Sequence, residues 1–347
     1  MRRHTGTTVA VLLVALLVVV PAWSQRYVLS LFTLALVTAL LAVSVNMLAG
    51  EVGLVSMGHA GISASAAYAV AWAIRDQQGL ATQLSVALLV TLLVSALYGL
   101  TAMRTSGLVF LMITLALGMV VYGLAFKWSK VTGGQSGLTG IRRPESLLDP
   151  YTFYYFCLVV LAVTLCVLWA VGRSPLGLSF RGIRDSEGRM NSLGYATPAI
   201  KFVAMMVSGL VAGVAGVLAV WNSQFMSPSA AAFEVSAIAV IIIIIGGVGS
   251  PLGPIIGAGL VVGIEHWLSS YVERWPTLLG LLFIAVVILM PRGVAGVVWD
   301  RRTPSRPALP WTALLRRSSG DRSTTTPSDE EIPAGDLTDV RGRHQEG

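Results

Sequence analysis

Ionisable side chains inside apolar stretches are the residues of this chain whose chemistry most needs an explanation. Glu51 and His59 lie eight residues apart at the entrance of an apolar run, so an unbroken helix would place both on one face. At membrane depth such a pair can relay protons or line a path for a polar solute. Two plainer interpretations stay open: Glu51 solvates a helix start at the membrane edge, and His59 completes a hydrogen bond between helices. Glu265 and His266 form a second pair, which we expect at an interface.

The sequence lacks the motifs of several enzyme classes. It has no GxxxxGKS/T phosphate loop, no HExxH and no CxxC, so we expect no bound ATP, no metal site and no cofactor in this chain. GQSG at 134–137 has the form of a membrane serine-protease motif, but it lies in a polar loop. Cys157 and Cys166 would lie about 13 Å apart along a helix, too far for a disulfide, and we interpret both as packing residues. We predict no catalytic residue and no enzymatic activity.

Composition indicates which elements must position these residues. The chain is 55% hydrophobic and only 12% charged, with a mean hydropathy of +0.75, whereas charged residues make up about a quarter of ordinary soluble domains. Apolar runs recur that are long enough to cross about 30 Å of hydrocarbon as helices. We predict an all-α polytopic membrane protein with about ten transmembrane helices, some of them broken or re-entrant. The predicted spans are 8–23, 27–49, 57–74, 83–103, 106–126, 151–172, 198–221, 235–247, 253–270 and 275–291.

One hydrophilic segment, residues 174–195, interrupts the apolar pattern. It is compatible with a helix, and it carries charges of both signs before a terminating glycine: Arg181, Arg184, Asp185, Glu187, Arg189 and Gly194. Mixed signs favour a protein surface, so we predict that this segment docks on a partner. An amphipathic helix lying on anionic lipid is the alternative, although a basic stripe would suit lipid better. Lys201, which follows the segment, is expected to snorkel to the membrane surface.

Glycine-rich stretches mark three places, at 49–62, 132–140 and 246–259. Small residues let helices approach closely, and glycine with proline breaks helices where the backbone can face a cavity. A moving pathway needs such breaks, whereas a passive anchor does not. We predict that residues 53–62 and 246–259, with a contribution from Thr114, line a weak, transient pathway for a small zwitterion or polar solute. The candidate pathway residues are Gly53, Ser56, His59, Thr114, Gly246, Gly247 and Gly249.

The distribution of arginine and lysine predicts the orientation. Six spans precede segment 174–195 and four follow it, so both termini share its side, and that side carries the larger number of basic residues near the membrane. The net charge of +7 thus reflects topology and does not indicate nucleic acid. Residues 1–296 form the predicted transmembrane domain, and residues 297–347 form a predicted disordered tail. Whether residues 1–25 act as a cleaved signal peptide stays open.

Six ordered blocks resemble the membrane subunits of branched-chain amino acid ABC importers, the LivM-like permeases. The resemblance extends over about residues 53–260, and it is the order of the blocks that makes it specific. The blocks are GLVSMGHAGISASAAY (53–68), SGLVFLMITLALGMV (106–120), TGGQSGLTGI (132–141), SPLGLSFRGIRDSEGRMNSLGY (174–195), KFVAMMVSGLVAGVAGVL (201–218) and GGVGSPLGPIIGAG (246–259).

The resemblance implies a multi-pass permease subunit of a bacterial inner (plasma) membrane, with both termini in the cytoplasm. It implies that the subunit assembles with two ATP-binding cassette subunits that hydrolyse ATP and with a second homologous permease subunit. It also implies an extracytoplasmic solute-binding protein, and a location in the lipid bilayer. The family's ATPase-coupling segment maps to Arg181–Gly194. The usual Glu-Ala-Ala pattern of that segment is poorly kept, because Arg189, Met190 and Asn191 follow Glu187.

Branched-chain or other small amino acids are the substrates that the resemblance implies. Related permeases of this type carry urea or short amides, and that alternative stays open. A rival from another class is an ion-coupled secondary transporter with Glu51 or His59 as its proton site. Such a transporter would work without an ATPase or a binding protein. A structural membrane protein is a third possibility, but it leaves the glycine-rich breaks unexplained.

Overall fold

The structure is a computed structural model, and it describes residues 17–18, 25–269, 277, 280–281 and 293. The predicted spans 8–23 and 275–291 lie almost entirely outside the described residues, and the predicted tail 297–347 lies wholly outside them. Among the described residues every regular element is a helix or helical turn, apart from one isolated antiparallel bridge between Leu138 and Met226.

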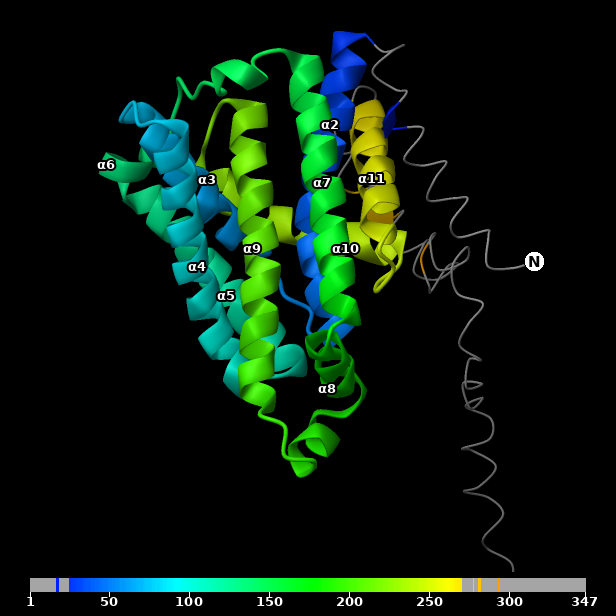
Figure 1. The fold of residues 1–347 in the computed structure, drawn as a ribbon. Helices are drawn as coiled ribbons and strands as arrows, with labels where there is room; N and C mark the ends of the chain where they lie inside the picture. Colours follow the sequence, from blue (N-terminus) through cyan, green and yellow to red (C-terminus); the bar gives the residue numbers. More distant parts are fainter. Residues whose placement is uncertain (1–16, 19–24, 270–276, 278–279, 282–292, 294–347) are drawn as a thin grey trace, which may run out of the picture. The chain divides into compact units, whose positions relative to one another are not determined.

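The helices follow the apolar runs of the sequence, and Figure 1 shows most of them side by side in a bundle. The longer elements are α2 (Arg26–Met47), α3 (His59–Arg75), α4 (Leu80–Arg104), α5 (Gly107–Lys127), α7 (Pro150–Arg173), α8 (Pro175–Ser192), α9 (Thr197–Ser223), α10 (Phe233–Gly246) and α11 (Gly253–Ser269). The short ones are the π-helical turn Leu48–Val52, α6 (Ser129–Thr132), and the 3-10 turns Gly134–Ser136, Glu145–Leu147 and Pro228–Ala231.

The structure confirms the predicted all-helical membrane architecture. Eight of the ten predicted spans coincide with helices, and the other two are the spans that lie outside the described residues. Five helices are long and apolar enough to cross a membrane: Arg26–Val52, Leu80–Arg104, Gly107–Lys127, Pro150–Arg173 and Thr197–Ser223. With 14 residues, α10 rises only about 21 Å, which is less than the hydrocarbon thickness.

Helix breaks occur at the two predicted glycine-rich stretches. At the first, α2 passes into the π-helical turn, and Gly53 then reverses the chain with φ +80°, a conformation that glycine adopts without steric cost. Residues 53–58 run without helical structure before α3 begins. At the second, a turn at 247–252 joins α10 to α11, and the two helices pack against each other.

The centre of the bundle is α9, which makes its most extensive contacts with α3 and α4. Its glycines lie directly against small polar residues of those helices: Gly209 against Ser95, Gly213 against Thr91 and Gly216 against Ser63. Lipid tails are as apolar as leucine, so helices in a membrane associate through such close contacts and not through hydrophobic burial. α9 is thus packed closely against both α3 and α4.

The charged segment of the sequence forms α8, at the end of the bundle where α7 ends and α9 begins (Figure 1). The Ser174 hydroxyl caps its first turn by accepting a hydrogen bond from the Gly177 amide, and Pro175 occupies the first helical position. Its buried residues are Gly177, Phe180 and Ile183, which share one face. Ser186 has φ −170° and ψ 102°, so it divides α8 into two short helices.

Candidate functional site: the α8 joint and the central hydrogen-bond joint

The first half of α8 is attached to the π-helical turn and to the end of α7. The Arg181 guanidinium donates a hydrogen bond of 2.8 Å to the Gly172 carbonyl and lies 3.7 Å from the Glu51 carboxylate. Arg184 donates to the Gly50 carbonyl, and it lies 3.7 Å from the Asp185 carboxylate. Two of the predicted coupling residues therefore bind their own chain, and they hold α8 at the break that follows α2.

The second half of α8 is attached to α9 through Lys201, for which the sequence-based prediction of snorkelling is wrong. The Lys201 ammonium lies 2.7 Å from the Glu187 carboxylate and donates a 3.0 Å hydrogen bond to the Thr105 carbonyl. Its side chain is only 2% exposed, whereas that of Glu187 is 32% exposed. An ammonium that has two acceptors inside the protein does not need to reach bulk water. Lys201 therefore joins α8, α9 and the turn between α4 and α5.

The exposed residues of α8 and of the turn that follows it include charges of both signs and apolar side chains. Asp185, Arg189 and Gly194 are exposed, and so are the large side chains Leu193 and Tyr195. Gly194, with φ +85°, ends the segment as predicted. This face therefore combines charged groups of both signs with exposed apolar side chains.

His59 lies at the centre of a set of hydrogen bonds that connects α2, α3 and α9, called the central joint below. It is fully buried, with Nδ1 3.0 Å from the Ser56 hydroxyl and Nε2 2.6 Å from the Ser208 hydroxyl. The Ser208 hydroxyl donates its one proton to the Ser44 carbonyl at 2.7 Å, so it must accept from His59 Nε2–H. Nδ1 then accepts from Ser56. A neutral imidazole satisfies every one of these bonds, in agreement with the hydrogen-bonded interpretation of His59.

The turn at 247–252 is attached to α2 by a side chain that the sequence analysis overlooked. Asn46 Oδ1 accepts from the Gly249 amide at 2.8 Å, and its Nδ2 donates to the Ser250 carbonyl at 3.0 Å. Gly50 lies so close to Gly249 that an added Cβ would come within 2.6 Å of the Gly249 Cα. An asparagine inside an apolar span was the available signal, because a polar side chain in a membrane helix nearly always has a partner.

The remaining predicted pathway residues fall into two groups, one at the start of α3 and one at the 247–252 turn, with Gly53 apart from both. Thr114 accepts a 3.3 Å hydrogen bond from the Met57 amide, and the Ser236 hydroxyl of α10 accepts from the Ala60 amide at 3.1 Å. Gly246 and Gly247 form the end of α10 at the turn. Hydrogen bonds and close contacts therefore bring Ser56, His59 and Thr114 together at the start of α3, and Gly246, Gly247 and Gly249 together at the turn. Gly53 lies instead against the Arg184 side chain of α8.

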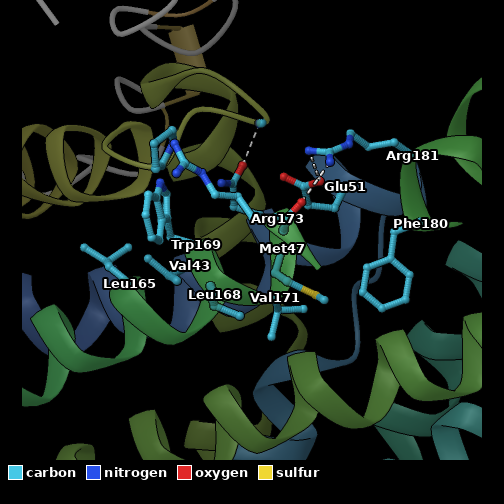
Figure 2. A pocket seen from close by; sticks show the side chains of 14 residues that line it. Val43, Met47, Glu51, Leu165, Leu168, Trp169, Val171, Arg173, Phe180 and Arg181 are labelled. Carbon is cyan, nitrogen blue, oxygen red and sulfur yellow. Dashed lines mark hydrogen bonds and ion pairs between the residues drawn. The ribbon is translucent and has the colours of Figure 1, made fainter. Parts of the chain in front are cut away.

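Two cavities lie on either side of this joint. The cavity nearer to α8, called the inner cavity below, has a volume of about 250 Å³ and is lined by the end of α2, the end of α7, the start of α8 and the 247–252 turn. Figure 2 shows Glu51 and Arg181 toward one side of it, Arg173 with Trp169 toward the other, and aliphatic side chains below them in this view. The outer cavity, about 450 Å³, lies toward the opposite end of α9, among α2, α3, α9, α10 and α11. Its lining is mainly aliphatic, with serine hydroxyls and the Glu265 carboxylate.

Arg143, in the loop that precedes α7, binds the end of α9. Its guanidinium donates to the Trp221 and Asn222 carbonyls at 2.6 and 3.1 Å, and it stacks 4.1 Å above the Phe153 ring. Burial lowers the pKa of this guanidinium below its ordinary value. Arg143 thus caps the helix carbonyls that α9 leaves unpaired. Of the two cysteines, Cys157 is buried as predicted, whereas Cys166 is exposed.

Comparison with known proteins gives a consistent result. The family model described as branched-chain amino acid transport system / permease component matches residues 27–291. The high-affinity branched-chain amino acid transport system permease protein LivM of Escherichia coli (strain K12) is 28% identical, over 83% of this chain and 76% of the relative; the LivM protein of Salmonella typhimurium (strain LT2) gives the same figures.

The probable branched-chain amino acid transport permease protein LivH of Methanocaldococcus jannaschii is 23% identical, over 57% of this chain and 67% of the relative. No solved structure matches the chain significantly. The family model covers most of the chain, including every helix of the joints described above. The chain therefore belongs to the family of permease components of branched-chain amino acid transport systems.

Proposed function

We propose that this chain is the permease subunit of an ATP-driven importer that translocates branched-chain or other small amino acids. The LivM and LivH relatives described above are named as branched-chain amino acid permeases. The partners in this proposal are two separate ATP-binding cassette subunits, a second homologous permease and an extracytoplasmic solute-binding protein. We place α8 and both chain termini on the cytoplasmic side, in keeping with the excess of basic residues there.

The observation that carries the coupling part of the proposal is the attachment of α8. Three polar links bind it to the transmembrane helices, through Arg181, Arg184 and Glu187. Asp185 and Arg189 remain on its exposed face. A helix that is bound on one side to moving helices and exposes mixed charges on the other can transmit displacement from a docked ATPase.

The proposed pathway passes the central joint between the outer and inner cavities. The aliphatic outer cavity suits a branched side chain, and Glu265 is available there for an ammonium group. Between the cavities the joint is closed by neutral hydrogen bonds through His59 and Asn46. Such bonds are worth only about 0.6 kcal/mol on average in a membrane, so ATP-driven movement of α9 and α10 can open them. Ser56, Thr114 and the glycines of the 247–252 turn would then face the substrate.

Uptake by the purified complex tests the function itself. We expect leucine uptake that requires ATP and the binding protein, does not depend on an imposed proton gradient, and survives His59→Ala at a reduced rate. Uptake by this chain alone, driven by the gradient and lost with His59, would establish an ion-coupled transporter instead. Uptake of urea or short amides in place of leucine would refute the substrate assignment but not the ATP-driven mechanism.

Reversal of the exposed charges of α8 tests the docking face. We expect Asp185→Arg combined with Arg189→Glu to weaken association with the ATPase by about tenfold, since like charges would then meet across the interface. Arg142→Glu, an exposed charge reversal outside α8, is the matched control. Unchanged ATPase association in the double variant would contradict docking at this face.

A further inference from the structure

We propose that the inner cavity binds a free α-amino acid in its zwitterionic form, and that its occupation slows transport from the α8 side. The inference rests on the proposed function, because the ligand is the product that the importer would deliver. It adds a site on the exit side that senses this product.

The first observation is a buried carboxylate oxygen without a hydrogen-bond donor. Glu51 Oε2 is enclosed, yet no hydrogen bond to it exists among the described residues. Its ion-pair partner, Arg181 Nη1, is 3.7 Å away, beyond hydrogen-bond distance. A buried acceptor left in this state is uncommon in native proteins and calls for a ligand, an ion or water. Glu51 lines the inner cavity, so a ligand ammonium placed there would supply the missing donor.

The second observation is a guanidinium without a carboxylate on the other side of the cavity. Arg173 lies 3.8 Å above the Trp169 ring, and no carboxylate of the described part of the chain lies within ion-pair distance of it. Stacking on an indole leaves the edge of a guanidinium free to form a two-pronged bond with a carboxylate. Figure 2 shows Arg173 and Glu51 separated across the cavity. A zwitterion presents charges of the complementary signs, with its carboxylate toward Arg173 and its ammonium toward Glu51.

The third observation is the lining between these charges. Val43, Met47, Leu165 and Leu168 provide aliphatic surface, which suits a branched hydrocarbon side chain. The cavity volume of about 250 Å³ lies below the range of about 300–1,000 Å³ typical for drug-sized ligands, so it suits a smaller molecule.

The position of the cavity connects binding to coupling. Arg181 belongs to α8, and its ion pair with Glu51 is one of the links that hold α8 to the bundle. A ligand ammonium at Glu51 would compete with Arg181 for the same carboxylate and bridge α2 to α7 through Arg173. The first effect would weaken the link through which α8 can move α2, and the second would hold α2 against α7, so both would slow transport.

A phospholipid is the main competing occupant, because Trp169 and Arg173 lie at the end of a membrane helix. The Glu51 carboxylate argues against it, since it would repel a lipid phosphate placed in the same small cavity. Binding measurements with the purified complex, without the solute-binding protein, distinguish the two. We expect saturable binding of radiolabelled L-leucine, and much weaker binding of L-leucinamide and of 4-methylpentanoate, which each lack one charged group.

The decisive variants are Arg173→Gln and Arg173→Lys. We expect Arg173→Gln to weaken L-leucine binding by about tenfold, because a charge-assisted bond to the carboxylate is lost, with Arg173→Lys in between. Arg142→Gln is the matched control. Glu51→Gln should weaken binding as well. Absence of saturable L-leucine binding, unchanged binding in both Arg173 variants, or a bound phospholipid that L-leucine fails to displace would overturn the proposal.

Proteoliposomes separate this inference from the proposed function. Basal ATP-driven uptake into empty vesicles measures the function alone. L-Leucine preloaded on the α8 side should slow uptake and ATP hydrolysis in the wild-type complex, and Arg173→Gln should remove this inhibition while basal uptake continues. Basal uptake that is equally fast at all preloaded L-leucine concentrations would refute the exit-side site and leave the importer intact.

Discussion

Two sets of contacts in this permease differ in their chemistry: those that hold α8 to the bundle (the α8 joint) and the hydrogen bonds at the centre of the bundle (the central joint). At the α8 end, charged groups form the links: Arg181 with Glu51, and Lys201 with Glu187. At the central joint, neutral groups form them, through His59, Ser208 and Asn46. Charges are tolerable where water can reach one partner, as it reaches Glu187, whereas a charge at membrane depth is expensive. The charged links therefore lie at α8, where a docked ATPase would act on the permease. The weaker, neutral hydrogen bonds lie at the centre, where the proposed pathway must open.

Removing the buried ammonium should have the largest effect on this contrast. Lys201→Met leaves the Glu187 carboxylate and the Thr105 carbonyl without their donor. Breaking a fully buried ion pair costs about 3–5 kcal/mol, but Glu187 is one-third exposed, so we expect about 2–3 kcal/mol. Thermal unfolding of the detergent-solubilised complex measures the loss. The exposed Lys130→Met serves as control, and equal stability of the two variants would contradict a structural role for Lys201.

Disturbing the close backbone contact between Gly50 and the 247–252 turn should have a somewhat smaller effect. The added methyl of Gly50→Ala would overlap the Gly249 backbone, which has no flexible side chain to move aside. Overpacking of this kind costs about 1–3 kcal/mol. Gly188→Ala is the matched control, because an added Cβ at Gly188 would meet no atom within 4 Å. A Gly50→Ala complex that melts at the wild-type temperature would show that α2 and the turn can separate freely.

Loss of the His59 imidazole should lower the free energy of unfolding by a smaller amount than the two changes above. His59→Leu removes the acceptor for Ser56 and the donor to Ser208, and we expect about 1 kcal/mol of destabilisation, in the range measured for hydrogen bonds between membrane helices. His59→Gln, which keeps a donor and an acceptor, should lose less. Thermal unfolding measures both variants. If His59→Leu destabilised the complex more than Lys201→Met does, the central hydrogen bonds would contribute more stability than the charged contacts of α8, contrary to this account.

The smallest effect concerns a helix cap far from either joint. The Thr152 amide and hydroxyl donate to the Asp149 carboxylate at the start of α7, and this hydrogen bonding holds the pKa of Asp149 below its ordinary value. A lowered folded-state pKa contributes stability at neutral pH that is lost as pH falls through that pKa. Asp149→Asn should therefore lower stability slightly at neutral pH. The difference should begin to shrink below about pH 4, the ordinary pKa of Asp, and vanish only when the pH lies below the lowered folded-state pKa. A difference that grows in acid would refute the cap.

The sequence allowed the helices, the breaks and the charged segment to be predicted, because each depends on local composition. The apolar runs gave α4, α5, α7 and α9 to within a few residues. Pairings between distant elements were not predictable. Lys201 follows a charged segment, so snorkelling was the local expectation, but the fold places the Thr105 carbonyl and the Glu187 carboxylate around its ammonium. The contacts of Arg143 with α9 likewise depend on how a loop folds back.

In the candidate site, too, single residues could be predicted from the sequence, whereas their distant partners could not. Residue types marked Glu51, His59 and the glycine-rich turns, because ionisable groups and glycine are unusual at membrane depth. Their hydrogen-bond partners were invisible, since serine is common in membrane helices and any of several could have faced His59. Ser208 became identifiable only once α9 was placed against α2 and α3.

The number of substrate molecules moved per ATP hydrolysed tests the central claim most directly. In reconstituted complexes we expect Lys201→Met to lower this ratio severalfold, because α8 loses its link to α9 while the ATPase still turns over. His59→Gln should slow uptake and ATP hydrolysis in parallel and leave the ratio at the wild-type value. A wild-type ratio in Lys201→Met together with a reduced ratio in His59→Gln would contradict the assignment of coupling to the charged joint.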